Sequence, residues 1–227
     1  EMKLRKMDIS STFYLQTQRT ARIAVLGEAG PAVQDCFVVM HGYRQLAERF
    51  LRRFAPLAAP ERLILAPEGL SRFYLADQRP HVGASWMTRE DREHEIEDQF
   101  AYLELLYRRF AERLSPTVRW HLFGFSQGVA TLWRWLLQSE LEASSITICC
   151  GIVPEEENER LQQQLQQARL CNIYALADEF IPVRKSEEQA EKLKQGYPHS
   201  QNLAVEGAHD LHREMFRRWE AEFFQEG

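Results

Sequence analysis

Residues 118–128 read Val-Arg-Trp-His-Leu-Phe-Gly-Phe-Ser-Gln-Gly, which is the most informative stretch of the chain. It starts as an apolar run typical of a buried strand and ends in Gly-Phe-Ser-Gln-Gly at 124–128. Apolar residues at helical spacing follow at once, over residues 129–137. A strand, a G-x-S-x-G turn and a helix in succession form a nucleophile elbow, whose tight turn strains the serine and points its hydroxyl away from the sheet. Ser126 is therefore a candidate nucleophile; the alternative is a serine in an ordinary turn.

The length and composition predict a single domain over residues 1–227, since this length suffices for one α/β core. The 44% hydrophobic and 27% charged fractions are typical of soluble globular proteins. The net charge is −5 and no basic cluster covers a face, so nucleic acid is not an expected partner. No apolar run reaches the roughly 20 residues of a membrane span, and residues 1–6 lack a signal-peptide core. We expect a cytoplasmic protein without stable membrane insertion.

The four cysteines, Cys36, Cys149, Cys150 and Cys171, form no C-x-x-C pattern, and three lie in or beside strand-like runs. We expect small buried thiols in a reducing compartment. Cys149 and Cys150 would face opposite sides of a strand, which argues against a functional pair.

Short apolar runs alternate with amphipathic segments along most of the chain. The runs lie at 36–40, 62–66, 118–123, 146–150, 172–176 and 202–205. Helical spacing marks segments at 46–57, 96–114, 161–165, 190–193 and 211–223. This alternation predicts an α/β fold: a mostly parallel sheet of about eight strands with helices on both faces. Residues 10–17 and 20–27 predict an antiparallel hairpin at the edge of that sheet.

Two connections bear on ligand binding. Residues 67–88 predict a loop of about twenty residues, far longer than usual for a connection between a strand and a helix. It leads to Thr88-Arg-Glu-Asp91, which resembles a capping box before the long second helix. By contrast, residues 151–171 hold only one short helix, so a large lid domain is not expected there.

An acid and a base follow later strands in the order that a serine nucleophile requires. A serine hydroxyl needs a base to take its proton and a third group to orient that base. In this architecture the chain order is serine, acid, histidine, each at the carboxyl end of a strand. Asp178 follows the run at 172–176, and His209 follows the run at 202–205. Both positions fit.

Other residues near these positions are weaker candidates. Glu179 adjoins Asp178 but would point the other way in a short turn. Asp210 is next to His209 in sequence, and neighbours rarely form the required hydrogen bond. His212 is predicted to lie already on the final helix. A metal site built on His209 and His212 lacks an H-E-x-x-H motif or a cysteine partner, so no metal is expected.

The oxyanion of an acyl-transfer reaction needs two backbone N–H donors. One is expected from Gln127, directly after the serine. The other is expected from Tyr43, in the loop after the strand at 36–40, where Gly42 lets the backbone turn inward. His41 is predicted to pin this loop rather than to take part in the chemistry.

Four sequence motifs together resemble a known family. They are His41-Gly42-Tyr43, Gly124-Phe125-Ser126-Gln127-Gly128, Asp178 followed by Ile181-Pro182-Val183, and Gly207-Ala208-His209. They resemble the phospholipase/carboxylesterase branch of the α/β-hydrolases, which includes the acyl-protein thioesterases. The resemblance extends from about residue 20 to 223. It implies a Ser126–Asp178–His209 triad and an oxyanion hole formed by the Tyr43 and Gln127 N–H groups.

The substrate pocket is where the chain departs from this family pattern. Trp86 matches a tryptophan that the family places beside the acyl or alcohol pocket. Arg44 stands where the family usually has glycine, and residues 66–74 are not part of the general pattern. Arg44, Arg72 and Tyr74 are candidates to bind an anionic or polar group of the substrate; the alternative is that they are surface residues.

These features predict a serine hydrolase that cleaves small or medium carboxylic esters or thioesters. No metal or organic cofactor is implied, and the expected partner is a small-molecule substrate. Two alternatives stay open: an acyltransferase or peptidase with the same acyl-enzyme, and a non-catalytic binding protein on this scaffold.

Overall fold

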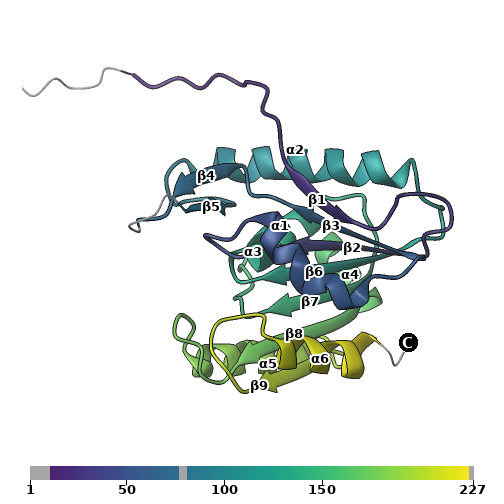
Figure 1. Ribbon diagram of the computed structural model, residues 1–227. Helices are drawn as coiled ribbons and strands as arrows, with labels where there is room; N and C mark the ends of the chain where they lie inside the picture. Colours follow the sequence, from purple (N-terminus) through teal and green to yellow (C-terminus); the bar gives the residue numbers. More distant parts are fainter. Residues whose placement is uncertain (1–10, 77–80, 225–227) are drawn as a thin grey trace, which may run out of the picture.

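The central layer is a seven-stranded sheet with strand order β1-β3-β2-β6-β7-β8-β9 (Figure 1). The structure is a computed structural model that describes residues 11–76 and 81–224. The strands are β1 (Ile23–Leu26), β2 (Asp35–Met40), β3 (Arg62–Pro67), β6 (Arg119–Phe125), β7 (Ala143–Cys149), β8 (Arg169–Ala175) and β9 (Gln201–Val205). All neighbours pair in parallel except β1, which runs antiparallel to β3.

Helices cover both faces of this sheet (Figure 1). They are α1 (Ala47–Leu51), η1 (Arg52–Leu57), α2 (Arg92–Ala111), α3 (Gln127–Leu136), α4 (Glu159–Gln167), α5 (Val183–Gly196), α6 (Arg213–Trp219) and η2 (Glu220–Phe224). Two apolar clusters result. Val38 and Met40 pack in the cluster with α2 to α5, whereas Phe37 and Val39 pack with α1 and α6. A central strand covered on both sides buries every residue, as β2 does.

The predicted fold class is confirmed: the chain has an α/β-hydrolase-like fold with a mostly parallel sheet. All six apolar runs form strands, and only α4 is inserted between β7 and β8. No helix among the described residues is long and apolar enough to cross a membrane.

The predicted N-terminal hairpin is wrong, and the sheet has seven strands rather than about eight. Only β1 forms from the run at 20–27, and it pairs with β3. Residues 11–17 form no strand, and residue 10 lies outside the described residues. Phe13 and Leu15 stay exposed. The physical reason is that β-propensity depends on packing, and these apolar side chains are not buried.

The segment predicted as a plain loop at 67–88 holds a second, two-stranded antiparallel sheet, formed by β4 (Ser71–Tyr74) and β5 (Val82–Ser85). Residues 77–80 lie outside the described residues. Gly83 lets β5 approach the backbone of residue 44, because a Cβ there would lie 2.5 Å from the Arg44 carbonyl oxygen. The hairpin therefore packs directly on the loop that follows β2.

The predicted capping box before α2 is also wrong. Asp91 is the N-cap, in a left-handed conformation with φ 52°, and its side chain makes no capping hydrogen bond. Instead the Glu95 carboxylate accepts the Thr88 N–H at 2.5 Å. Asp91 adopts a left-handed conformation, and Thr88 before it lies within reach of the Glu95 side chain in the first turn of α2.

Candidate active site

Ser126 lies in a strained turn between β6 and α3. Its backbone has φ 53° and ψ −118°, a conformation that L-residues rarely adopt. A Cβ at Gly124 would lie 2.8 Å from the Val129 Cα, and one at Gly128 would lie 2.4 Å from the Met40 carbonyl oxygen. The two glycines are thus required by close backbone approach on either side of the serine.

The structure brings Ser126, His209 and Asp178 into one hydrogen-bonded chain. His209 Nε2 lies 2.8 Å from Ser126 Oγ, and His209 Nδ1 lies 2.6 Å from Asp178 Oδ2. The other Asp178 oxygen accepts the backbone N–H groups of Phe180 and Ile181, each at 2.8 Å. Because the carboxylate accepts the Nδ1 proton, the lone pair of Nε2 faces the serine hydroxyl. This arrangement can deprotonate Ser126.

The alternative residues are engaged elsewhere. Glu179 was expected to point away from the site. Instead it accepts the His209 backbone N–H at 2.9 Å, and this hydrogen bond lowers the pKa of Glu179. The His209 amide is a donor within reach of the turn, which explains the orientation. Asp210 forms an ion pair with Arg53. His212 caps the N-terminus of α6. The structure describes no group of three or more His, Cys, Asp or Glu residues that could hold a metal ion.

The loop at residues 41–46, between β2 and α1, lies against the nucleophile. A Cβ at Gly42 would be 3.1 Å from the Ser126 Cβ and 2.9 Å from the Phe125 ring. Within the described part of the chain the Tyr43 N–H donates to no acceptor. Gln127 is the first residue of α3, so its N–H has no intrahelical acceptor. Two backbone donors are thus free beside Ser126.

His41 fixes the start of the 41–46 loop. Its Nδ1 lies 2.8 Å from the Gly42 carbonyl oxygen, and its Nε2 accepts the Gly69 N–H at 3.0 Å. The ring is fully buried and stacks on Trp86. Burial lowers the pKa of His41, which keeps the ring neutral with its proton on Nδ1. His41 therefore pins the loop, as predicted from the sequence.

The four predicted substrate-binding residues differ in their surroundings. Trp86 is 1% exposed and donates its indole N–H to the His41 carbonyl oxygen at 2.7 Å. Its ring is buried in the core and stacks on His41, and its predicted contact with the substrate stays a prediction. The Arg72 Nε–H donates to Glu68 at 2.6 Å, so the guanidinium that was predicted to bind substrate is paired with a carboxylate of the same chain. Arg44 is exposed, with φ 69°.

Tyr74 faces away from the 41–46 loop for a geometric reason. Phe73 precedes it on β4 and stacks on the Tyr43 ring, with centroids 5.2 Å apart. Successive side chains on a strand point to opposite faces, so Tyr74 extends into solvent on the other side.

Two further side chains at the site were missed by sequence reasoning. The Gln127 side-chain amide accepts the Trp86 N–H at 3.0 Å and donates to the Met87 carbonyl oxygen at 2.8 Å. It ties the elbow to the end of β5; only its backbone N–H had been considered. Phe180 is 72% exposed and packs edge-on against the His209 ring at 5.1 Å. Its place two residues after Asp178 was the available signal.

The chain matches the model of one known protein family. A model of the phospholipase/carboxylesterase family matches residues 80–223, more than half of the chain. The chain belongs to the phospholipase/carboxylesterase family. The match includes Ser126, Asp178 and His209 but begins after the 41–46 loop. No curated protein sequence matches this family member significantly.

Solved structures share the fold of this phospholipase/carboxylesterase-family chain at low sequence identity. Acyl-protein thioesterase 2 of Zea mays is 15% identical with a TM-score of 0.68, over 89% of this chain and 99% of its own. Esterase PE8 is 20% identical with a TM-score of 0.66, over 91% and 99%. A phospholipase/carboxylesterase from Dyadobacter fermentans is 14% identical with a TM-score of 0.60, over 91% and 97%.

Proposed function

We propose that this protein is a serine hydrolase that cleaves carboxylic esters or thioesters through an acyl-enzyme on Ser126. The observation that carries the proposal is the continuous hydrogen-bonded chain from Ser126 Oγ through His209 to Asp178. The strained elbow and the membership of a phospholipase/carboxylesterase family support it.

In this proposal each residue has one task. His209 Nε2 takes the Ser126 proton while Oγ attacks the carbonyl carbon. The negative charge that develops on the carbonyl oxygen is held by the Tyr43 and Gln127 N–H groups. When the tetrahedral intermediate collapses, His209 returns the proton to the leaving alcohol or thiol. Water, deprotonated by His209, then attacks the acyl-enzyme and releases the acid.

The surroundings of Ser126 favour a small or medium acyl substrate. Phe180, which packs against His209, and Tyr43, which follows Gly42, both expose aromatic surface. Such surface gains free energy when it covers an apolar chain, about 25 cal/mol per Å². Only the short helix α4 lies between β7 and β8, so this connection holds no large lid of the kind that would enclose a lipid. An acyl-protein thioesterase and an esterase are among the proteins with this fold.

The test combines active-site labelling with a rate series. A fluorophosphonate probe should label the wild type and the Ser115→Ala control, whose serine is partly exposed in the turn before β6, but not Ser126→Ala. Rates on p-nitrophenyl esters and matched thioesters of increasing chain length would define the substrate class. Turnover at the wild-type rate by a folded Ser126→Ala protein would end the proposal.

A further inference from the structure

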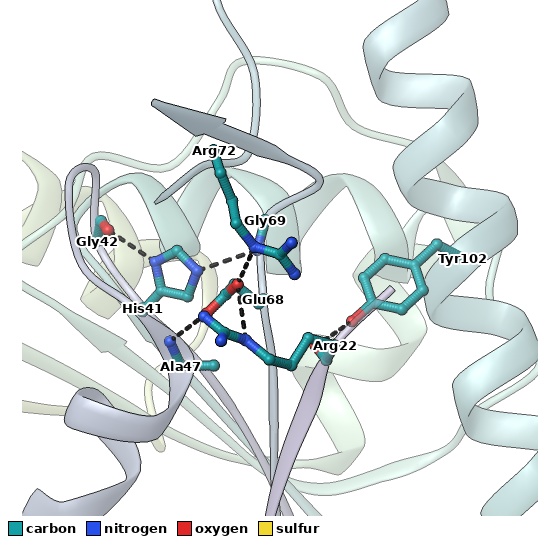
Figure 2. A network of polar contacts seen from close by, with 8 residues as sticks. All are labelled: Arg22, His41, Gly42, Ala47, Glu68, Gly69, Arg72 and Tyr102. Carbon is teal, nitrogen blue, oxygen red and sulfur yellow. Dashed lines mark hydrogen bonds and ion pairs between the residues drawn. The ribbon is translucent and has the colours of Figure 1, made fainter. Parts of the chain in front are cut away.

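A buried carboxylate lies behind the 41–46 loop, at the end of β3 (Figure 2). Glu68 is 1% exposed and accepts hydrogen bonds from Arg22 Nε at 3.0 Å, Arg22 Nη2 at 2.7 Å and Arg72 Nε at 2.6 Å. Burial alone would raise the pKa of Glu68, but the bonds from Arg22 and Arg72 outweigh it and leave the pKa below its ordinary value. The group is therefore held as an anion.

Glu68 and its neighbour Gly69 hold the 41–46 loop at both of its ends. At the start, the Gly69 N–H donates to His41 Nε2 at 3.0 Å. At the far end, the N–H of Ala47, the first residue of α1, donates to Glu68 Oε2 at 3.0 Å. Figure 2 shows both contacts converging on the same two residues of the chain. Both ends of the loop are thus tied to one dipeptide that lies outside it.

The same carboxylate also connects the loop to the β4–β5 hairpin. Arg72, which donates to Glu68, lies on β4. On β5, the Ala84 carbonyl oxygen accepts the Arg44 N–H at 2.9 Å. The Tyr43 ring stacks on Phe73 of this hairpin. Loop and hairpin are therefore held in one arrangement, with the Glu68 charge as their shared contact.

We infer that Glu68 is a positioning residue that aims the Tyr43 N–H at the oxyanion formed on the Ser126 adduct. The inference rests on the proposed function. Donors of an oxyanion hole act only when they are fixed in place before the reaction, and losing one donor costs about 100- to 1,000-fold in kcat. A loop released at one end would keep its donor but misplace it for part of the time. The loss would then fall on kcat rather than on substrate binding.

The chain offers a matched control at the opposite end of β2. Asp35 is 4% exposed and accepts hydrogen bonds from Arg119 Nε at 2.7 Å and Arg119 Nη2 at 2.9 Å. Like Glu68, it is a buried carboxylate with a lowered pKa. Because Asp35 begins the strand that ends at Met40, it lies far from the 41–46 loop. Glu68→Gln and Asp35→Asn each remove one such charge.

The experiment compares these two variants with the wild type by ester kinetics and by amide hydrogen exchange over residues 41–47. Glu68→Gln should lower kcat about tenfold, which is less than complete loss of a donor, with KM within about twofold. It should also speed exchange in the loop. Asp35→Asn should lower the melting temperature but leave kcat and loop exchange at wild-type values.

Two results would overturn the inference. One is a folded Glu68→Gln protein with wild-type kcat and wild-type exchange in the loop. The other is an equal fall in kcat for Asp35→Asn, which would assign the effect to lost stability. The failure of the proposed function is a separate result: wild-type turnover in Ser126→Ala. In that case the exchange data still decide whether Glu68 holds the loop.

Discussion

Asp178→Asn tests how the hydrogen bonds of one carboxylate set the protonation of His209. Asp178 accepts three hydrogen bonds: one from His209 Nδ1 at 2.6 Å, and two from the backbone N–H groups of Phe180 and Ile181 at 2.8 Å. Asparagine has one oxygen and one NH₂ group in place of the two carboxylate oxygens. Whichever way it turns, the NH₂ group faces a donor.

The backbone decides which way the asparagine turns. If its NH₂ group faced Phe180 and Ile181, two backbone donors would lose their acceptor, whereas the opposite orientation affects only His209. The oxygen therefore stays with the backbone, and the NH₂ group donates to His209 Nδ1. The imidazole proton moves to Nε2, which can no longer accept the proton of Ser126. The expected loss of kcat is about 10⁴-fold, or roughly 5.5 kcal/mol in the transition state.

The assay is steady-state hydrolysis of a p-nitrophenyl ester, with circular dichroism to confirm folding. Glu179→Gln is the matched control: it changes the neighbouring carboxylate, and its amide oxygen can still accept the His209 backbone N–H. We expect the control within about threefold of wild type, since an exposed hydrogen bond contributes little. A folded Asp178→Asn protein that retains more than a tenth of wild-type kcat would refute the assignment of the tautomer.

Three further predictions concern the fold around the site. Gly128→Ala should lower the free energy of unfolding by about 1–3 kcal/mol in urea titrations, because its Cβ would lie 2.4 Å from the Met40 carbonyl oxygen; unchanged stability would contradict the tight contact. Burial lowers the pKa of His41, so its contribution to stability is present above the unfolded pKa of about 6.5 and is lost as pH falls through the folded pKa. The free energy of unfolding of the wild type should fall on acidification from pH 7, and that of His41→Gln should fall less. The same pH dependence in both proteins would count against this. Burial raises the pKa of the Cys36 and Cys149 thiols, so Ellman's reagent should react with neither until the protein unfolds, and rapid native labelling would disprove it.

The strands and the candidate triad differ in how far local sequence encodes them. The six parallel strands were predicted because each is a buried apolar run, a signal carried within a few residues. The order of Ser126, Asp178 and His209 was predicted because each follows such a run. The run at 10–17 looked equally strand-like, yet residues 11–17 form no strand. A strand needs a partner strand and a surface to pack against, and the local sequence specifies neither.

The elbow, the alternation of strands and helices, and the order of the candidate triad could all be predicted from the sequence, because periodicity and chain order encode them locally. The burial of Trp86 and the pairing of Arg72 with Glu68 follow from the tertiary structure alone. The direction of Glu179 was decided in the same way. The physical reason is that burial and hydrogen bonding depend on which distant elements meet a side chain. The 41–46 loop illustrates this, since Gly69 and Glu68, which hold its ends, belong to another strand connection.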